Sequence, residues 1–246
     1  MATVILVRHG RTTANASGVL AGRTPGVHLD ETGRQQAAAA AERLSGVTLA
    51  RIVSSPMERC KETAQALAKA QGRGRDTSQP TRPRVRVDKG LTECDYGDWQ
   101  GRALKDLVKE KLWKVVQSQP SAVEFPGGET MRAMQERAVD AVRRHDALVT
   151  AEHGPHAVWV AVSHADVIKS VLADALGTHL DLFQRLHVDP ASLSVVSYTE
   201  VRPFVLCVNT SQGSLSHLQP PAKARRRRAA TDAVVGGGAG PAGGTS

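Results

Sequence analysis

Arginine and histidine side chains follow apolar runs in this sequence, and their chemistry suits phosphate esters. VILVRHG ends an apolar run on Arg8 and His9, and VAVSH ends another on His164. Arg59 lies in SSPMERC, and Glu93 lies in LTECDYGDW. A neutral imidazole is a nucleophile near pH 7, because its unperturbed pKa is about 6.5. A guanidinium group matches phosphate oxygens, and a protonated carboxyl group can donate to a leaving oxygen. This set of side chains could therefore transfer a phosphoryl group through His9.

Alternating strands and helices would bring these residues to one edge of a sheet. Strand-like apolar runs are found at Val4–Val7, Arg51–Ser54, Val85–Val87, Val158–Ser163, Leu193–Tyr198 and Phe204–Val208. Helical patterns separate most of them, which predicts a three-layer α/β/α domain with a mostly parallel sheet. Ligands of such sheets bind beyond the carboxyl ends of the strands, where Arg8, His9 and His164 are expected. Gly10 is expected to let the backbone approach that ligand closely.

Helix-start signals follow two of the predicted strands or their loops. Thr32–Gln35 has the spacing of a capping box and predicts a helix that ends at Gly46. Ser55–Glu58 predicts a second capping box, with proline at the first helical position. Further helices are expected near Gly128 and just after His164. Helices that alternate with the predicted strands in this way support an α/β domain.

Composition excludes several classes of protein. The chain has 246 residues, 41% of them hydrophobic, which is enough for one sizeable core. No apolar run is long enough to span a bilayer and no export signal is visible at the start, so a cytoplasmic chain without membrane contact is expected. Cys60, Cys94 and Cys207 are far apart and are expected to be free thiols, with no metal site and no disulfide.

A basic segment rich in glycine, proline and alanine follows the predicted strands. Residues 219–246 are interpreted as a disordered tail, and residues 1–218 as the folded domain. The tail holds five basic residues and one acidic one, half of the net charge of +8. Arg225–Arg228 could bind a polyanion, which is the alternative function from another class. Aromatic residues are only 3% of the chain, which disfavours a nucleic-acid surface built on base stacking.

Several motifs resemble the histidine phosphatase superfamily, in the branch of cofactor-dependent phosphoglycerate mutase. They are LVRHGRTTAN, LDETGRQQA, SSPMERCKETA, LTECDYGDWQG, FPGGE and VSHADVIK, in the order of that family. Overall the chain is most similar to actinobacterial members described as phosphomutases or phosphatases. The resemblance implies a phosphoglycerate-mutase-like fold and hydrolysis of a small phosphorylated metabolite, with no metal and no diffusible cofactor.

The resemblance also implies roles for the residues singled out above. By position, His9 resembles the nucleophile that becomes phosphorylated. Arg8, Arg59 and His164 resemble the phosphate pocket, and Glu93 resembles the proton donor. All five are predicted to be catalytic.

Three more residues complete the predicted substrate site. Asn15 resembles a contact to the substrate phosphate, and Arg11 and Ala165 stand where the family more often has Glu or Gln and Gly. Asp166 is an alternative proton donor, because one branch of the family has an aspartate directly after the second histidine. Its offset differs by one residue, so Glu93 is favoured.

Two further questions stay open at the level of sequence. A phosphoglycerate-type mutase is the alternative within the same family, and it would need a bisphosphate to prime His9. The segment 102–124 is expected to set substrate specificity, and it does not identify the substrate. A homodimer is an option for the assembly.

Overall fold

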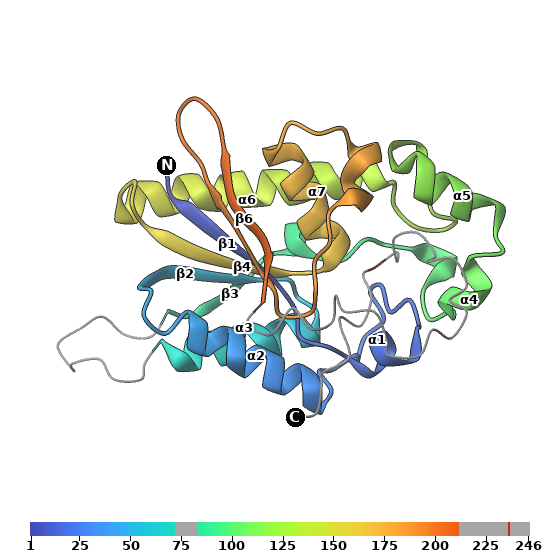
Figure 1. The fold of residues 1–246 in the computed structure, drawn as a ribbon, viewed down its shortest axis with the longest axis horizontal. Coiled ribbons are helices and arrows are strands. Elements are labelled where there is room, and N and C mark those ends of the chain that lie inside the picture. The colour runs from blue at the N-terminus through green and yellow to red at the C-terminus, as the bar shows by residue number, and fades with distance from the viewer. Residues whose placement is uncertain (72–82, 212–235, 237–246) are drawn as a thin grey trace, which may run out of the picture.

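A mixed six-stranded sheet forms the centre of the structure, a computed structural model that describes residues 1–71, 83–211 and 236 (Figure 1). Its strands are β1 (Thr3–Arg8), β2 (Leu49–Ser54), β3 (Val85–Val87), β4 (Val158–Ser163), β5 (Leu193–Ser197) and β6 (Phe204–Thr210). Their order in the sheet is β3-β2-β4-β1-β5-β6. The first four strands run parallel to one another, whereas β5 and β6 are antiparallel additions at one edge. All six strands predicted from the apolar runs are present.

Helices cover both faces of this sheet, which confirms the three-layer α/β/α arrangement. The helices are α1 (Thr13–Ser17), α2 (Glu31–Arg43), α3 (Glu58–Ala70), α4 (Leu104–Leu107), α5 (Lys111–Ser118), α6 (Met131–His153) and α7 (Ala165–Ala175). Short 3-10 turns lie at Lys89–Leu91, Gly97–Trp99, Pro120–Ala122 and Leu180–Arg185. Figure 1 shows α2 and α3 below the sheet and α6 and α7 above it.

The two layers of core follow from the alternation of side chains along each strand. In β1, Val4 and Leu6 belong to the larger apolar core, which includes buried residues of α6 and α7. Ile5 and Val7 belong to the other core, which includes buried residues of α2 and α3. A strand that is buried on both faces reads as a continuous apolar run, as β1 does.

The predicted starts of α2 and α3 were both wrong by a few residues. The N-cap of α2 is Asp30, whose side chain accepts from the Gly33 N–H, so Thr32 lies inside the helix. Helix α3 has Met57 as its N-cap and no side-chain cap bond. The Ser55 hydroxyl is hydrogen-bonded to His164 instead. Each segment holds more than one side chain that could cap a helix, and tertiary contacts decide which one does.

Gly10 is needed for a close approach of two backbone segments. A Cβ atom on Gly10 would lie 2.3 Å from the carbonyl oxygen of Gly33, at the start of α2. The expectation that Gly10 makes room for a ligand is therefore corrected: the neighbour that excludes a side chain there is the protein backbone itself. The contact holds the first turn of α2 against the end of β1.

Some predictions fall on residues that the structure does not describe. The boundary at residue 218 and the basic segment Arg225–Arg228 lie outside the described residues. Of the predicted tail, only Gly236 is described. Across the described ranges, no helix has both the length and the apolar character needed to cross a membrane.

Candidate active site

His9 and His164 lie side by side because β1 and β4 are neighbours in the sheet. The two strands pair in parallel with Arg8 opposite Ser163. The next residues, His9 and His164, therefore lie at the same level of the sheet. The His9 N–H donates to the Ser163 carbonyl oxygen at 3.0 Å, which extends the pairing by one residue. The two imidazole rings meet edge to face, with centroids 5.2 Å apart. This is the carboxyl edge of the parallel strands, where the sequence predicted the site.

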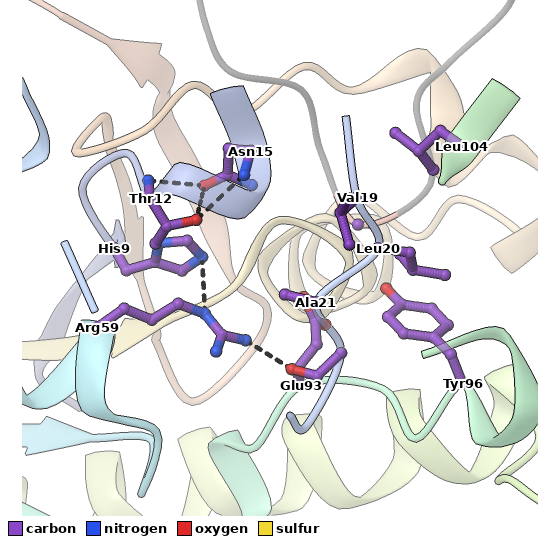
Figure 2. Close-up of a pocket in the computed structure, with 12 residues that line it drawn as sticks. His9, Thr12, Asn15, Val19, Leu20, Ala21, Arg59, Glu93, Tyr96 and Leu104 are labelled. Carbon is purple, nitrogen blue, oxygen red and sulfur yellow. Dashed lines mark hydrogen bonds between the residues drawn. The ribbon is translucent and has the colours of Figure 1, made fainter. Parts of the chain in front are cut away.

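The hydrogen bonds of His9 leave one ring nitrogen directed at the site. Its Nδ1 lies 2.7 Å from the carbonyl oxygen of Gly10, an acceptor, so Nδ1 carries the proton. Its Nε2 faces Arg59, whose Nε–H donates to it at 3.3 Å (Figure 2). Burial, together with the charges of Arg59 and Arg8, holds the pKa of His9 well below its usual value. His9 is therefore a neutral imidazole at neutral pH, and the lone pair of its Nε2 accepts the hydrogen bond from Arg59.

Arg59 comes from the first turn of α3 and reaches back over the strand ends. Its Nη2 donates to the Gly22 carbonyl oxygen at 2.7 Å and lies 3.2 Å from Nδ1 of His164. Only 2% of its surface is exposed. One guanidinium group thus lies next to both histidines, as predicted from its place after β2.

Arg8 lies behind the histidines, buried at the end of β1. Its Nη1 donates to the Val188 carbonyl oxygen at 2.8 Å. Burial lowers the pKa of Arg8 to about 10, so it still carries its charge at neutral pH. Two buried cations at one strand end give the site a positive potential that suits a dianionic phosphate.

His164 is held by a hydroxyl group that the sequence did not single out. Its Nε2 lies 2.8 Å from Oγ of Ser55, the residue that follows β2. Burial, and then the charge of Arg59, lowers the pKa of His164 well below its usual value. The serine pair in SSPMERC is the only local signal for this contact, and the same pattern also predicts a helix cap.

Glu93 enters the site from a loop that two arginines hold in place. Arg23 and Arg137 donate to its carbonyl oxygen at 2.9 and 3.1 Å. Its carboxylate accepts from the Cys94 N–H at 2.9 Å and lies 3.8 Å from Nδ1 of His164. Burial, and then the nearby charge of Asp166, raises the pKa of Glu93 to about 7. A carboxyl group with this pKa can both give and take a proton near neutral pH.

His9, Arg59 and Glu93 line a pocket with a polar and an apolar side, whereas Arg8 and His164 are not among its lining residues. It is lined by His9, Thr12, Asn15, Val19, Leu20, Ala21, Gly22, Arg59, Glu93, Tyr96, Leu104 and Gly236. Figure 2 shows the polar side at His9, Thr12, Asn15 and Arg59, and the apolar side at Val19, Leu20, Tyr96 and Leu104. Glu93 lies between the two sides. An ester could therefore place its phosphate on the first side and its alcohol portion on the second.

The three predicted substrate residues have different positions. Asn15 lines the pocket, where its side-chain oxygen accepts from the N–H and hydroxyl of Thr12. Arg11 points elsewhere, because its guanidinium group binds Asp30 and Thr32. Ala165 is buried at the start of α7 and is not part of the lining. Of the three, only Asn15 is thus placed at the pocket.

Sequence reasoning named Asp166 as an alternative proton donor but missed the polar cluster around it, which lies next to Tyr96 of the pocket. Asp166 is fully buried there, and its Oδ2 accepts from the Tyr96 hydroxyl at 2.8 Å. Lys169, one turn further along α7, places its Nζ 2.9 Å from Oδ1. Among the residues described, no three or more His, Cys, Asp or Glu side chains are grouped so that they could hold a metal ion.

Comparisons with curated proteins find relatives over most of the chain. The chain spans about half the length of the first curated relatives it matches, among them a bifunctional protein of Mycobacterium tuberculosis, which is 33% identical over 79% of this chain. A probable phosphoglycerate mutase of Salmonella choleraesuis is 29% identical, with 90% of this chain and 97% of that protein covered.

Solved structures are also similar to this chain over most of its length. The mycobacterial glucosyl-3-phosphoglycerate phosphatase in complex with VO3 has a TM-score of 0.73 and 27% identity, covering 85% of this chain and 99% of that one. The family model of the histidine phosphatase superfamily, branch 1, matches residues 4–211. This match includes all six strands except Thr3, the first residue of β1, and all five predicted catalytic residues. The chain belongs to branch 1 of the histidine phosphatase superfamily.

Proposed function

We propose that the chain hydrolyses phosphate monoesters of small molecules through a phosphohistidine at His9. The observation that carries this proposal is the state of His9: its proton is on Nδ1, and its Nε2 faces the pocket beside Arg59. A neutral, fixed imidazole next to a buried cation is suited to attack on phosphorus. The similarity to a mycobacterial phosphatase supports the same reaction.

In the first step, Nε2 of His9 attacks phosphorus and the ester P–O bond breaks. Glu93 gives its proton to the leaving oxygen, so the alcohol departs neutral and the carboxylate remains. Arg8, Arg59 and His164 stabilise the charge on the phosphoryl oxygens. Glu93 is the better candidate for the acid, because it lines the pocket, whereas Asp166 is engaged by Lys169 and Tyr96.

In the second step, water replaces the alcohol. The Glu93 carboxylate takes a proton from the water molecule as its oxygen attacks phosphorus. The N–P bond to His9 breaks, and inorganic phosphate leaves with His9 and the protonated Glu93 restored. The raised pKa of Glu93 suits this exchange, since both of its protonation states are accessible near pH 7.

Rapid-quench mass spectrometry tests the proposal directly. During turnover of p-nitrophenyl phosphate, an acid-labile phosphate is expected on His9, and His9→Ala should abolish both label and turnover. His187→Ala is the matched control, because that side chain is 74% exposed and binds Asp189 away from the pocket. Wild-type rates in His9→Ala would overturn the mechanism.

A mutase is the second candidate, favoured by the similarity to a probable phosphoglycerate mutase. A mutase must return the phosphoryl group of His9 to a second hydroxyl group, whereas a phosphatase gives it to water. The two are separated with 3-phosphoglycerate, with and without 2,3-bisphosphoglycerate. Formation of 2-phosphoglycerate that depends on the bisphosphate would establish the mutase, and release of inorganic phosphate would establish the phosphatase.

The cellular setting and the assembly are part of the proposal. We place the chain in the cytoplasm, with a small phosphorylated molecule as its partner and no membrane or nucleic-acid partner. The three free cysteines, two of them buried, support a reducing compartment. A homodimer is proposed from the family resemblance, and light scattering at the elution peak of a sizing column tests it.

A further inference from the structure

One oxygen of the buried Asp166 carboxylate accepts a hydrogen bond from a residue that lines the pocket. Its Oδ2 accepts from the Tyr96 hydroxyl at 2.8 Å and from the backbone N–H of Gly236 at 2.9 Å. Gly236 lines the pocket, so the second of these donors comes from the pocket side. A carboxylate oxygen readily accepts two hydrogen bonds, and here one is supplied by the fixed core and the other by a residue at the site.

The remaining partners of Asp166 make this oxygen a strong and well-positioned acceptor. Lys169 binds Oδ1, and its own Nζ also donates to Gln184 at 2.7 Å and lies over the Phe183 ring. Asp166 is 0% exposed and Lys169 is 3% exposed, so water does not compete for either charge. The Lys169 ammonium lies on Oδ1, so Oδ2 is the oxygen that accepts from the Tyr96 hydroxyl and from the Gly236 N–H.

This acceptor lies on the side of the pocket where the alcohol portion of a substrate would bind. Leu20, Leu104 and Tyr96 lie on the side of the pocket away from His9 and Arg59 (Figure 2). A Cβ atom on Gly236 would lie 2.8 Å from Leu20 and 3.6 Å from the Tyr96 hydroxyl oxygen, so Gly236 occupies that side. A substrate that binds there takes the place of Gly236. It must then supply a donor to Oδ2 or leave a buried carboxylate oxygen with one partner fewer.

We propose that Asp166 is a specificity residue whose Oδ2 accepts a hydrogen bond from an ammonium or hydroxyl group on the alcohol portion of the substrate. The proposal rests on the phosphatase function above and names the substrate class: phosphate monoesters of amino alcohols or polyols, in preference to esters of plain alkyl alcohols. Glu93 and His9 act on the ester bond in both classes, so they do not contribute to this preference.

Pairs of esters with and without the donor test the proposal. O-Phosphoethanolamine is compared with propyl phosphate, and 3-aminopropyl phosphate with butyl phosphate, in which a methyl group replaces the ammonium group. For the wild type, kcat/KM is expected to favour the amine in at least one pair by roughly tenfold or more. 3-Hydroxypropyl phosphate against butyl phosphate gives the same comparison for a hydroxyl donor. All rates are measured at pH 5.5, below the pKa of Glu93.

Substitutions then assign the preference to Asp166. Asp166→Asn is expected to reduce the amine-to-alkyl ratio close to one, while the rate on the alkyl ester changes far less. Because Asp166→Asn leaves Lys169 buried without its anion, Asp166→Asn with Lys169→Met is measured beside it. Asp146→Asn is the matched control: Asp146 is also 0% exposed, and it binds Trp159 and the Ala2 N–H away from the pocket.

Each outcome separates the inference from the function on which it rests. A wild type without any preference, or a preference that survives in both Asp166 variants, would overturn the inference. Equal losses on both members of a pair would assign Asp166 a purely structural role and overturn it too. The proposed function is judged by p-nitrophenyl phosphate, which has no ammonium or hydroxyl donor. Hydrolysis of p-nitrophenyl phosphate without the preference leaves the phosphatase standing, and no hydrolysis of any ester would overturn both.

Discussion

The role of Glu93 as proton donor can be tested through the leaving group and the pH together. Glu93→Gln keeps the shape of the side chain and removes its acidic proton. Propanol leaves poorly as an alkoxide and needs that proton, whereas p-nitrophenolate leaves readily as an anion. At pH 5.5 the variant is expected to lose about a hundredfold or more in kcat/KM on propyl phosphate, and less than about tenfold on p-nitrophenyl phosphate.

The pKa of Glu93 fixes how this loss changes with pH. Burial and the charge of Asp166 raise that pKa to about 7, so the protonated fraction falls from roughly 90% at pH 6 to roughly 10% at pH 8. On propyl phosphate the ratio of wild-type to Glu93→Gln rates should therefore fall about tenfold between these pH values. His9 stays neutral throughout, because its pKa is lowered.

The test measures kcat/KM on both esters from the inorganic phosphate released at fixed times. Taking the ratio on one substrate cancels the ionisation of the ester itself. Asp166→Asn is the informative comparison, because it should show no dependence on the leaving group at pH 5.5. A selective loss on propyl phosphate in Asp166→Asn, but not in Glu93→Gln, would refute the reasoning and assign the acid to Asp166.

Three further predictions concern the arginine, a glycine contact and the end of the chain. Arg59→Lys should lower kcat roughly tenfold or more on both esters, because an ammonium cannot bind two phosphate oxygens side by side; steady-state kinetics measures this, and an unchanged kcat would remove Arg59 from the site. Gly10→Ala should lower the free energy of unfolding by about 1–3 kcal/mol, since its Cβ would lie 2.3 Å from the Gly33 oxygen. Urea denaturation checks this against Gly46→Ala, where a Cβ meets nothing within 4 Å, and equal stabilities would contradict it. Deletion of residues 219–246 should lower KM for small esters severalfold, because it removes Gly236, which lines the pocket and is hydrogen-bonded to Asp166. The composition of that segment alone predicts no change in KM, and steady-state kinetics that show an unchanged KM would contradict the prediction made from the structure.

The fold was predictable largely because its central strands β1, β2 and β4 are buried on both faces and read as apolar runs. The edge strands β3 and β6 are more exposed, but they too are rich in apolar residues, and all six strands were found within two residues of their observed ends. The ends of helices were less predictable: Asp30 and Thr32 can both cap α2, and only the packing at Gly33 decides between them. Local patterns thus determined the elements but not their first residues.

The site shows the same division between local and distant information. His9 and His164 were predictable because each directly follows a strand, and the pairing of β1 with β4 brings the two side chains together. The contact of Asp166 with Tyr96 joins residues 70 positions apart and depends on how α7 packs on the loop after Glu93. Propensity and spacing along the chain carry no signal for such a pair. The same is true of Gly236, whose surroundings in the sequence have no apolar pattern.

The central place of β1 has a consequence for the synthesis of the protein on the ribosome. Both neighbours of β1 in the sheet, β4 and β5, are made about 150 residues or more after it, since Thr3 pairs with Val158 and with Ser197. Strand β1 is therefore synthesised long before its partner strands, and its apolar side chains remain without their sheet contacts while most of the chain is made. Contacts of such sequence separation form slowly, and an exposed apolar strand is prone to aggregate or to bind a chaperone. Nascent chains that end before residue 158 would contain His9 but could form neither the sheet around it nor the contact of His9 with His164.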